Sequence, residues 1–342
     1  MSPLTRLGID LSKNVFHVVG VNALGREALR KTFSRLQLRQ FLATLPQCLV
    51  ATESCGTAFH WARYAKRCGH EPRIIASQFV KPYVKGNKND FNDAEAICEA
   101  AGRPSMRFVP VKSVEQQDVQ ALHRVRQRRM EERTALINQI RGFLLEYGVA
   151  VRLGPGVLRR AIPEILEDGS NELSGRGRAL FRALQEEWMQ LERLIKEIEK
   201  EIHGIYMASD ACRRLGEIDG IGPLTATALV AAVGSGADFK NGRHMAAWLG
   251  LVPRQHSSGG RDRLLGISKR GDCYLRSLLI HGARSVMKIA AKRSDRRCQW
   301  ARELEQRRGH NVATVALANK NARTAWAILA HGDRYRREAQ LS

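Results

Sequence analysis

The sequence lacks any apolar run long enough to cross a membrane, and its seven cysteines include no CxxC pair. A spanning helix needs about 20 apolar residues, and zinc sites usually combine closely paired cysteines, so both classes are excluded. The segment MSPLTRLGIDLSK is no secretory signal, because Asp10 and Lys13 interrupt it. The phosphate-cradling string GxxxxGK[ST] is also missing. We expect a soluble, cytoplasmic protein whose thiols are reduced.

Acidic residues are few beside basic ones, with 34 Asp and Glu against 56 Lys and Arg and a net charge of +22. A folded protein this basic usually has a polyanionic partner, most often nucleic acid. The 44% hydrophobic content argues against disorder. A length of 342 residues corresponds to about two domains of roughly 150 residues each.

Short apolar strands alternate with helical segments in the first hundred residues, which predicts a sheet covered by helices. Ser12-Lys13-Asn14 is a turn signal, so the first two strands form a hairpin. The expected strands are 7–10, 15–21, 27–33, 48–52 and 73–76, and the expected helices are 36–45 and 59–68.

From Ser113 the pattern becomes that of long helices. The first is amphipathic and strongly basic, with Arg124 and Arg128 among its arginines. Loop signals follow at 154–156 and 168–170. Apolar residues then recur from Phe181 to Ile205 at spacings of 3 and 4, which is typical of a coiled coil. This stripe packs on the preceding long helix, forms a seam between two copies of the chain, or does both.

The chain from about residue 210 is predicted to be helical, with a Gly-x-Gly turn at Gly220 and Gly222. A tight turn of this kind joins the helices of a helix-hairpin-helix, whose backbone N–H groups can contact a phosphate. An ordinary helical turn has the same pattern, so both interpretations stay open.

Four carboxylates in the first hundred residues are candidate metal ligands. Asp10 and Glu53 end predicted strands, and Asp90 and Asp93 share one face of a predicted helix. Carboxylates that converge repel one another unless cations neutralise them, and hard oxygen ligands suit Mg²⁺. Each acid alone could be a surface residue or a helix cap. Glu95, close to Asp93, is either an extra ligand or a solvated helix residue, and we expect the latter.

A second candidate site lies in the segment QHSSGG, where Ser257 and Ser258 stand beside glycines. A serine in a basic loop could attack a DNA phosphate if a base or metal activates it, although a flexible loop would have the same composition. Its basic neighbours are Arg254, Arg261, Arg263, Lys269, Arg270 and Arg276.

The strings GIDLSK, ATESCG, KNDFNDAEAI, LGEIDGIGPLTATALVAAVG, AAWLGLVPRQHSSGG and GISKRGDCYLRSLL occur in this order. With these motifs the sequence resembles the DEDD transposases of bacterial insertion sequences, the family numbered 110 and its subgroup numbered 1111, over nearly the whole chain. The resemblance implies a RuvC-like, RNase H-like domain over 1–110, a helical coiled-coil arm over 111–208, and a mainly helical transposase domain over 209–335.

The resemblance also implies roles for matching residues. The acidic tetrad falls on Asp10, Glu53, Asp90 and Asp93, which would bind Mg²⁺, and the nucleophile falls on Ser258, with Ser257 as the neighbouring alternative. Members of the family are thought to recombine DNA with a structured RNA that pairs with donor and target. They act as multimers, in which the tetrad of one subunit faces the serine of another.

Two other functions fit the same residues. A Holliday-junction nuclease would hydrolyse DNA with metal-activated water and would make no use of Ser258. A non-catalytic scaffold would bind nucleic acid in a salt-sensitive way through its charge alone.

Overall fold

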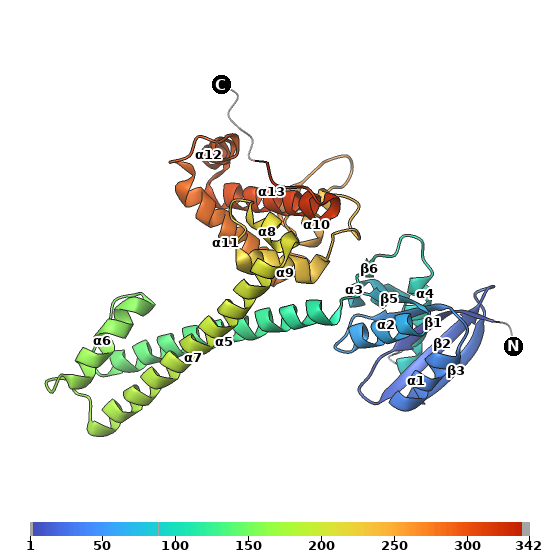
Figure 1. Cartoon of the computed structure of the whole chain (residues 1–342), viewed down its shortest axis with the longest axis horizontal. Coiled ribbons are helices and arrows are strands. Elements are labelled where there is room, and N and C mark those ends of the chain that lie inside the picture. The colour runs from blue at the N-terminus through green and yellow to red at the C-terminus, as the bar shows by residue number, and fades with distance from the viewer. Residues whose placement is uncertain (1–2, 88, 337–342) are drawn as a thin grey trace. The chain divides into compact units, whose positions relative to one another are not determined.

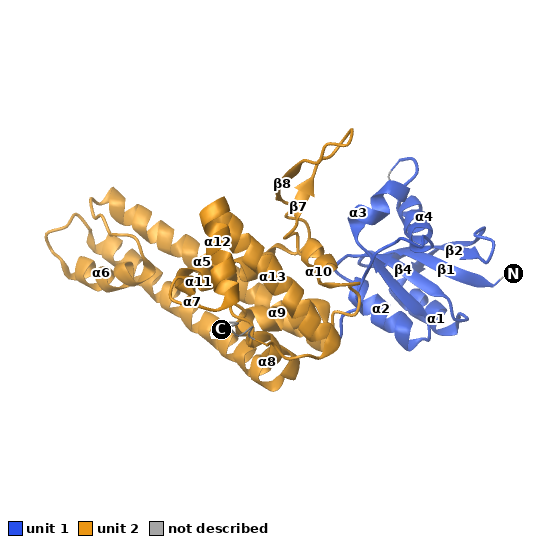
Figure 2. Cartoon of the chain, turned by 90° about the horizontal axis from the view of Figure 1, so that it is seen from above, with its two compact units in different colours: residues 1–113 blue, residues 114–342 orange. Residues whose placement is uncertain are grey.

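A computed structural model describes residues 3–87 and 89–336 and divides the chain into two compact units, residues 1–113 and 114–342 (Figure 2). The first unit is a mixed α/β domain and the second is mainly helical. Within the described residues, no helix combines the length and the apolarity that crossing a membrane requires.

Unit 1 is built on a six-stranded sheet with the order β3-β2-β1-β4-β5-β6. Strand β2 is antiparallel to β1 and β3, whereas β1, β4 and β5 run parallel to one another. This arrangement is consistent with the RNase H-like domain that the resemblance implies. The elements are β1 (Leu4–Asp10), β2 (Val15–Asn22), β3 (Glu27–Ser34), α1 (Arg35–Thr44), β4 (Leu49–Glu53), α2 (Ala58–Arg67), β5 (Glu71–Ile75), α3 (Ser77–Val80), a 3₁₀ turn (Lys81–Tyr83), α4 (Asp90–Ala101) and β6 (Phe108–Val109).

Alternation along β1 determines which helices cover each face of the sheet, because successive side chains of a strand point to opposite faces. Leu7 and Ile9 are buried in the cluster that contains the apolar residues of α1 and α2. Gly8 faces α4, and a Cβ there would lie 2.2 Å from the carbonyl oxygen of Ala94. Glycine is therefore needed for α4 to pack against this strand. Leu7 and Ile9 of β1 pack in one cluster with residues of α1 and α2, and Gly8 contacts α4 on the other face.

Two long helices of unit 2, α5 and α7, lie side by side (Figure 1). In α7, Phe181, Trp188, Ile195 and Ile202 recur every seven residues and are buried. Phe181 and Trp188 of this stripe are buried in one cluster with apolar residues of α5, as expected if the stripe packs on the preceding long helix, and a seam between two copies remains a prediction. The elements of unit 2 are α5 (Val114–Glu146), α6 (Pro155–Glu167), α7 (Gly175–Ala208), α8 (Asp210–Gly216), α9 (Pro223–Val233), α10 (Gly242–Trp248), β7 (Pro253–Gln255), β8 (Leu264–Ile267), α11 (Cys273–Ala290), α12 (Arg296–Arg308) and α13 (His310–His331).

Helix α6 was not expected, because the signals at 154–156 and 168–170 indicated only a loop region. Pro155 occupies the first turn of α6, where its missing N–H is no loss. Leu158 and Ile162 are buried in a cluster with Phe181. Apolar packing at the end of the α5–α7 pair therefore favours a helix between two loop signals.

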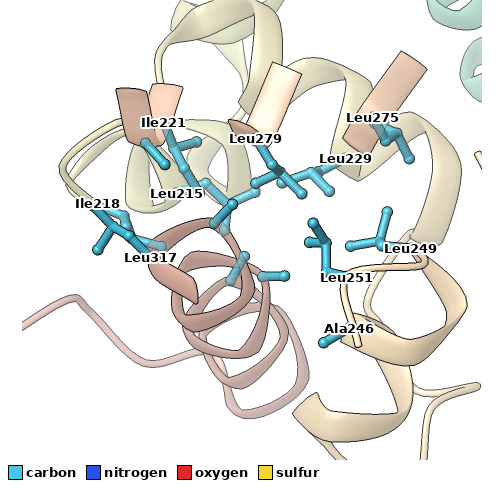
Figure 3. Close-up of a cluster of buried hydrophobic side chains, with 14 of the residues drawn as sticks. Leu215, Ile218, Ile221, Leu229, Ala246, Leu249, Leu251, Leu275, Leu279 and Leu317 are labelled. Atoms are coloured by element: carbon cyan, nitrogen blue, oxygen red, sulfur yellow. The ribbon is translucent and has the colours of Figure 1, made fainter. Parts of the chain in front are cut away.

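The C-terminal helices share one core, in which Leu215, Leu229, Leu279 and Leu317 come from four different helices (Figure 3). The turn between α8 and α9 is fixed against α11. Gly220 has a φ of +88°, and a Cβ at this position would lie 2.8 Å from the carbonyl oxygen of Gly282. The glycine is thus required by both its backbone conformation and its packing.

A buried histidine connects three helices of unit 2. His123 of α5 lies 2.9 Å from the hydroxyl of Tyr274 and 3.0 Å from Oγ1 of Thr227. The Thr227 hydroxyl donates to the carbonyl of Pro223 at 2.7 Å, so Nε2–H of His123 donates to Thr227 and Nδ1 accepts from Tyr274. Burial, with a smaller contribution from Arg126, lowers the pKa of His123 to about 4.

We expect unit 2 to lose stability as the pH falls below 6.5. His123 becomes protonated in the unfolded chain in this range but stays neutral in the folded chain, so protons favour the unfolded state. From the two pKa values, about 4 and 6.5, the loss between pH 7 and pH 5 is about 2 kcal/mol. Denaturant unfolding at both pH values measures it. In His123→Leu the pH-dependent part should largely disappear, and an equal loss in variant and wild type would contradict the assignment.

Candidate active site

Asp10 and Glu53 stand at the same end of adjacent parallel strands. Ile9 pairs with Thr52 in the register of β1 and β4, so Asp10 and Glu53 are the next residues along the two strands. Alternate residues of a strand point to the same face of the sheet, so Asp10 and Glu53 point to the same face as Gly8, which is the face covered by α4. The sheet therefore presents the two carboxylates together on its α4 side.

The other two acids lie in the first turn of α4, at Asp90 and Asp93. The side chain of Asn89 caps this helix by accepting a hydrogen bond from the N–H of Phe91 at 2.9 Å. The cap fixes where the helix begins, and the spacing of three residues then places both carboxylates on one face. Asp90 also lies 3.6 Å from Nδ1 of His17, whose strand position is opposite Asp10.

The carboxylates interact electrostatically around Asp10. Burial raises the pKa of Asp10, and the negative charges of Asp93, Asp90 and Glu53 raise it further, against a smaller opposing effect of His17. The structure thus brings Glu53, Asp90 and Asp93 close enough to Asp10 to interact with it electrostatically. Repulsion of this kind is relieved by protonation or by a bound cation.

Within residues 3–87 and 89–336, no three His, Cys, Asp or Glu side chains are arranged as ready ligands of one metal ion. The donor chemistry of the four carboxylates nonetheless fits a hard divalent cation, because all are oxygen ligands and their repulsion favours one. Glu95 does not belong to the group, since its carboxylate accepts a hydrogen bond from Arg30 at 2.9 Å.

The serine segment forms a β-hairpin that extends from the helices of unit 2 (Figure 2). Strands β7 and β8 pair, and the N–H of Arg261 donates to the carbonyl of Ser258 at 3.1 Å. Gly259 and Gly260 form the tip with φ values of +56° and +75°, as a type I′ turn requires. The glycines that suggested a flexible loop therefore close a defined turn.

The two serines have different surroundings, although both are exposed. The Ser257 hydroxyl accepts hydrogen bonds from Nε2 of Gln255 at 2.9 Å and from the N–H of Arg263 at 3.3 Å. The Ser258 side chain makes no hydrogen bond with any described residue. Ser257 thus helps to hold the hairpin together, whereas the Ser258 hydroxyl is available beside the tip.

Arg276 holds the base of this hairpin. Its Nη1 donates to the carbonyl of Leu249 at 3.0 Å and to that of Arg270 at 2.8 Å. The segments are packed so closely that a Cβ on Gly271 would lie 1.9 Å from the carbonyl oxygen of Trp248. Sequence reasoning assigned Arg276 to nucleic-acid binding; its backbone contacts give it a further, structural role that no sequence pattern identified.

Arg276→Gln is expected to loosen the hairpin base, because it removes charge-assisted hydrogen bonds worth about 1.5–3 kcal/mol each. The Ser268 amide, which donates to the carbonyl of Val252 at 2.8 Å, should exchange its hydrogen at least about tenfold faster. Hydrogen exchange with mass spectrometry measures the rate. Arg254→Gln is the control, because Arg254 is exposed on β7, and unchanged exchange in Arg276→Gln would refute the structural role.

The remaining basic candidates lie on exposed surfaces. Arg254, Arg261 and Arg263 are on the hairpin, and Lys269 and Arg270 follow it. Arg124 and Arg128 are exposed on α5, where Arg128 pairs with Glu132. Their charges surround the hairpin and line one of the long helices. His17 was not identified from the sequence; its position opposite Asp10 in the first predicted hairpin was the available signal.

Comparisons with known proteins show the family of the chain. A profile described as "Transposase IS116/IS110/IS902 family" matches residues 212–299, and a DEDD profile of the IS110 type, described as "Transposase", matches residues 7–149. A probable family 20 transposase of Pseudomonas aeruginosa is 50% identical over 97% of this chain and 99% of its own length.

Two insertion-sequence transposases are each 44% identical to the chain. The IS1111A transposase of Coxiella burnetii aligns over 98% of this chain and 92% of its own length. The IS1328 transposase of Yersinia enterocolitica aligns over 97% of this chain and 98% of its own length. The chain therefore belongs to the IS110 family of insertion-sequence transposases.

Proposed function

We propose that this transposase recombines DNA through a covalent link to Ser258, with a divalent cation at Asp10, Glu53, Asp90 and Asp93. The observation that carries the proposal is the gathering of the other three carboxylates around Asp10, whose pKa their charges help to raise. A strongly basic chain that concentrates negative charge at one point is consistent with a cation bound there.

The covalent step uses the Ser258 hydroxyl. Its oxygen attacks the phosphorus of a DNA phosphodiester, the bond from phosphorus to the 3′ oxygen breaks, and the proton lost by serine is balanced by one gained at the free 3′ hydroxyl. A 3′ hydroxyl of another strand then attacks the phosphoserine and regenerates serine. The bond energy is conserved, so no ATP is needed, in agreement with the missing P-loop string.

The tetrad would hold Mg²⁺, which when bound offsets the negative charge that develops on a reacting phosphate. The chain's own residues position the cation site: the ends of β1 and β4 supply Asp10 and Glu53, and the cap at Asn89 starts α4 so that Asp90 and Asp93 share a face. Arg261 and Arg263 beside Ser258 would hold the DNA backbone.

The proposed partners are element DNA, target DNA and a structured guide RNA. Gly220 and Gly222 and the arginines of α5, including Arg124 and Arg128, would contact nucleic-acid phosphates. A homo-oligomer would present the tetrad of one copy to the serine of another. Exposed apolar side chains on α5 and α7 support such assembly, among them Phe143, Leu180 and Met189, which are 40%, 49% and 57% exposed.

The test is to express the complete element in cells, lyse them in detergent, and recover DNA that stays attached to protein. The proposal expects a phosphoserine adduct, located by mass spectrometry. A hydrolytic nuclease would instead leave free DNA ends with no protein attached, and a scaffold would leave the DNA uncut.

A further inference from the structure

A polar cavity of about 930 Å³ lies in unit 2, away from the serine hairpin. Its lining residues come from the turn between α8 and α9, the start of α12, the second half of α13 and the segment that follows α13. Four cationic side chains line it, namely Arg297, Lys320, Arg334 and Arg336. None of these residues is used in the mechanism proposed above.

Arg297 is the unusual member of this lining because it is only 6% exposed. Its Nη1 donates to the hydroxyl of Tyr335 at 2.8 Å. Its Nε and Nη2 atoms are buried and have no hydrogen-bond partner among the described residues. A buried charged group with unused donors is unfavourable, so Arg297, a residue of the cavity lining, has two donors that lack an acceptor.

The carboxylates at the cavity do not accept hydrogen bonds from the two unpartnered nitrogens of Arg297. Asp219 and Asp295 each lie 3.0 Å from nitrogens of Arg293, and Asp295 also caps α12 by accepting from the N–H of Cys298. Asp333 is the third carboxylate of the lining. Two of the three negative charges are therefore shared with a further arginine, whereas the lining itself carries four cationic side chains.

We propose that this cavity binds the terminal phosphate of a nucleic-acid strand. A planar guanidinium with two unused N–H directions matches a phosphate, which accepts paired hydrogen bonds. A phosphate at a strand end carries more negative charge than a phosphate within the chain and is flanked by nucleotides on one side only, so it suits a cavity lined by several cations. The proposal does not depend on chemistry at Asp10 or Ser258.

The experiment compares ten-nucleotide single strands with a 5′ phosphate, a 3′ phosphate or neither, as DNA and as RNA. Binding to the full-length protein is measured with EDTA present, so that metal-dependent cleavage cannot contribute. At least one phosphorylated strand should bind about tenfold tighter than its unphosphorylated counterpart, and the DNA and RNA arms identify the source. Equal affinity for all strands would overturn the proposal.

Variants connect the preference to the cavity. Lys320→Gln with Arg334→Gln, at the lining, and Arg297→Met, at the buried position, should each remove the preference for the terminal phosphate. The double variant keeps the test valid if Arg297→Met does not fold. Arg308→Gln, on an exposed position of the same helix α12, should leave the preference unchanged.

Two further outcomes would also reject the proposal. Full preference in the double variant would place the phosphate elsewhere. Competition by a free mononucleotide that equals competition by the phosphorylated strand would assign the cavity to a small molecule.

Discussion

Replacing Ser258 by alanine is expected to abolish covalent protein–DNA adducts while DNA binding stays within about twofold of wild type. The hydroxyl makes no hydrogen bond with a described residue, and the turn is closed by the carbonyl of Ser258 and the N–H of Arg261. Alanine therefore preserves the hairpin and removes only the nucleophile. Loss of a nucleophile typically lowers a rate by more than about 10³-fold, which filter recovery of detergent-stable DNA adducts can measure.

Ser257→Ala is the matched control. It removes the acceptor of the hydrogen bonds from Gln255 and from the N–H of Arg263, so the hairpin loosens but the proposed nucleophile remains. Adducts should fall severalfold without disappearing. Adducts that persist in Ser258→Ala and vanish in Ser257→Ala would transfer the nucleophile to Ser257, and persistence in both variants would remove the serine mechanism.

The placement of the acids could be largely predicted from the sequence. Asp10 and Glu53 each end a short apolar run, and parallel strands bring such ends to one edge of a sheet. Asp90 and Asp93 have the spacing of one helix face. The sequence does not show which face of the sheet these side chains point to. Gly8, Asp10 and Glu53 lie on the face covered by α4 because Gly8 packs against Ala94, which is distant in the chain.

The surroundings of Ser258 were harder to predict, because glycine and serine are common in flexible loops and in tight turns. The strands on either side of the turn have only three and four residues and are exposed, so they lack the alternating apolar pattern that identifies a half-buried strand. Arg276 acts through backbone carbonyls of Leu249 and Arg270. Such contacts leave no signature in residue type or spacing.

Asp10→Asn is expected to eliminate strand cleavage and to stabilise the metal-free protein. The pKa of Asp10 is raised by burial and by neighbouring carboxylates, so the fold favours its neutral form. This stability penalty is absent below the ordinary pKa and fully present above the raised one. The variant should therefore have a higher melting temperature than wild type at pH 7, and the difference should shrink as the pH falls toward 4.

Magnesium should reverse this order of stability. A cation that binds only the folded state stabilises it by an amount set by its concentration relative to Kd. At tenfold excess over Kd, wild type should gain about 6 °C in melting temperature, whereas Asp10→Asn, which has lost a ligand and a charge, should gain much less. Glu71→Gln is the control, because it removes one exposed carboxylate of the same unit, paired with Arg73, and should respond to magnesium as wild type does.

The combined measurements separate catalysis from electrostatic strain. A scaffold that never cuts DNA would show the same nucleic-acid function in wild type and Asp10→Asn, and cleavage by the variant would remove Asp10 from catalysis. If the variant is inactive but gains as much stability from magnesium as wild type does, the ion binds elsewhere and the tetrad is not its site. The proposed site requires both results in Asp10→Asn, namely loss of cleavage and loss of the stabilisation by magnesium. Together they would show that the four carboxylates bind a cation that the reaction needs.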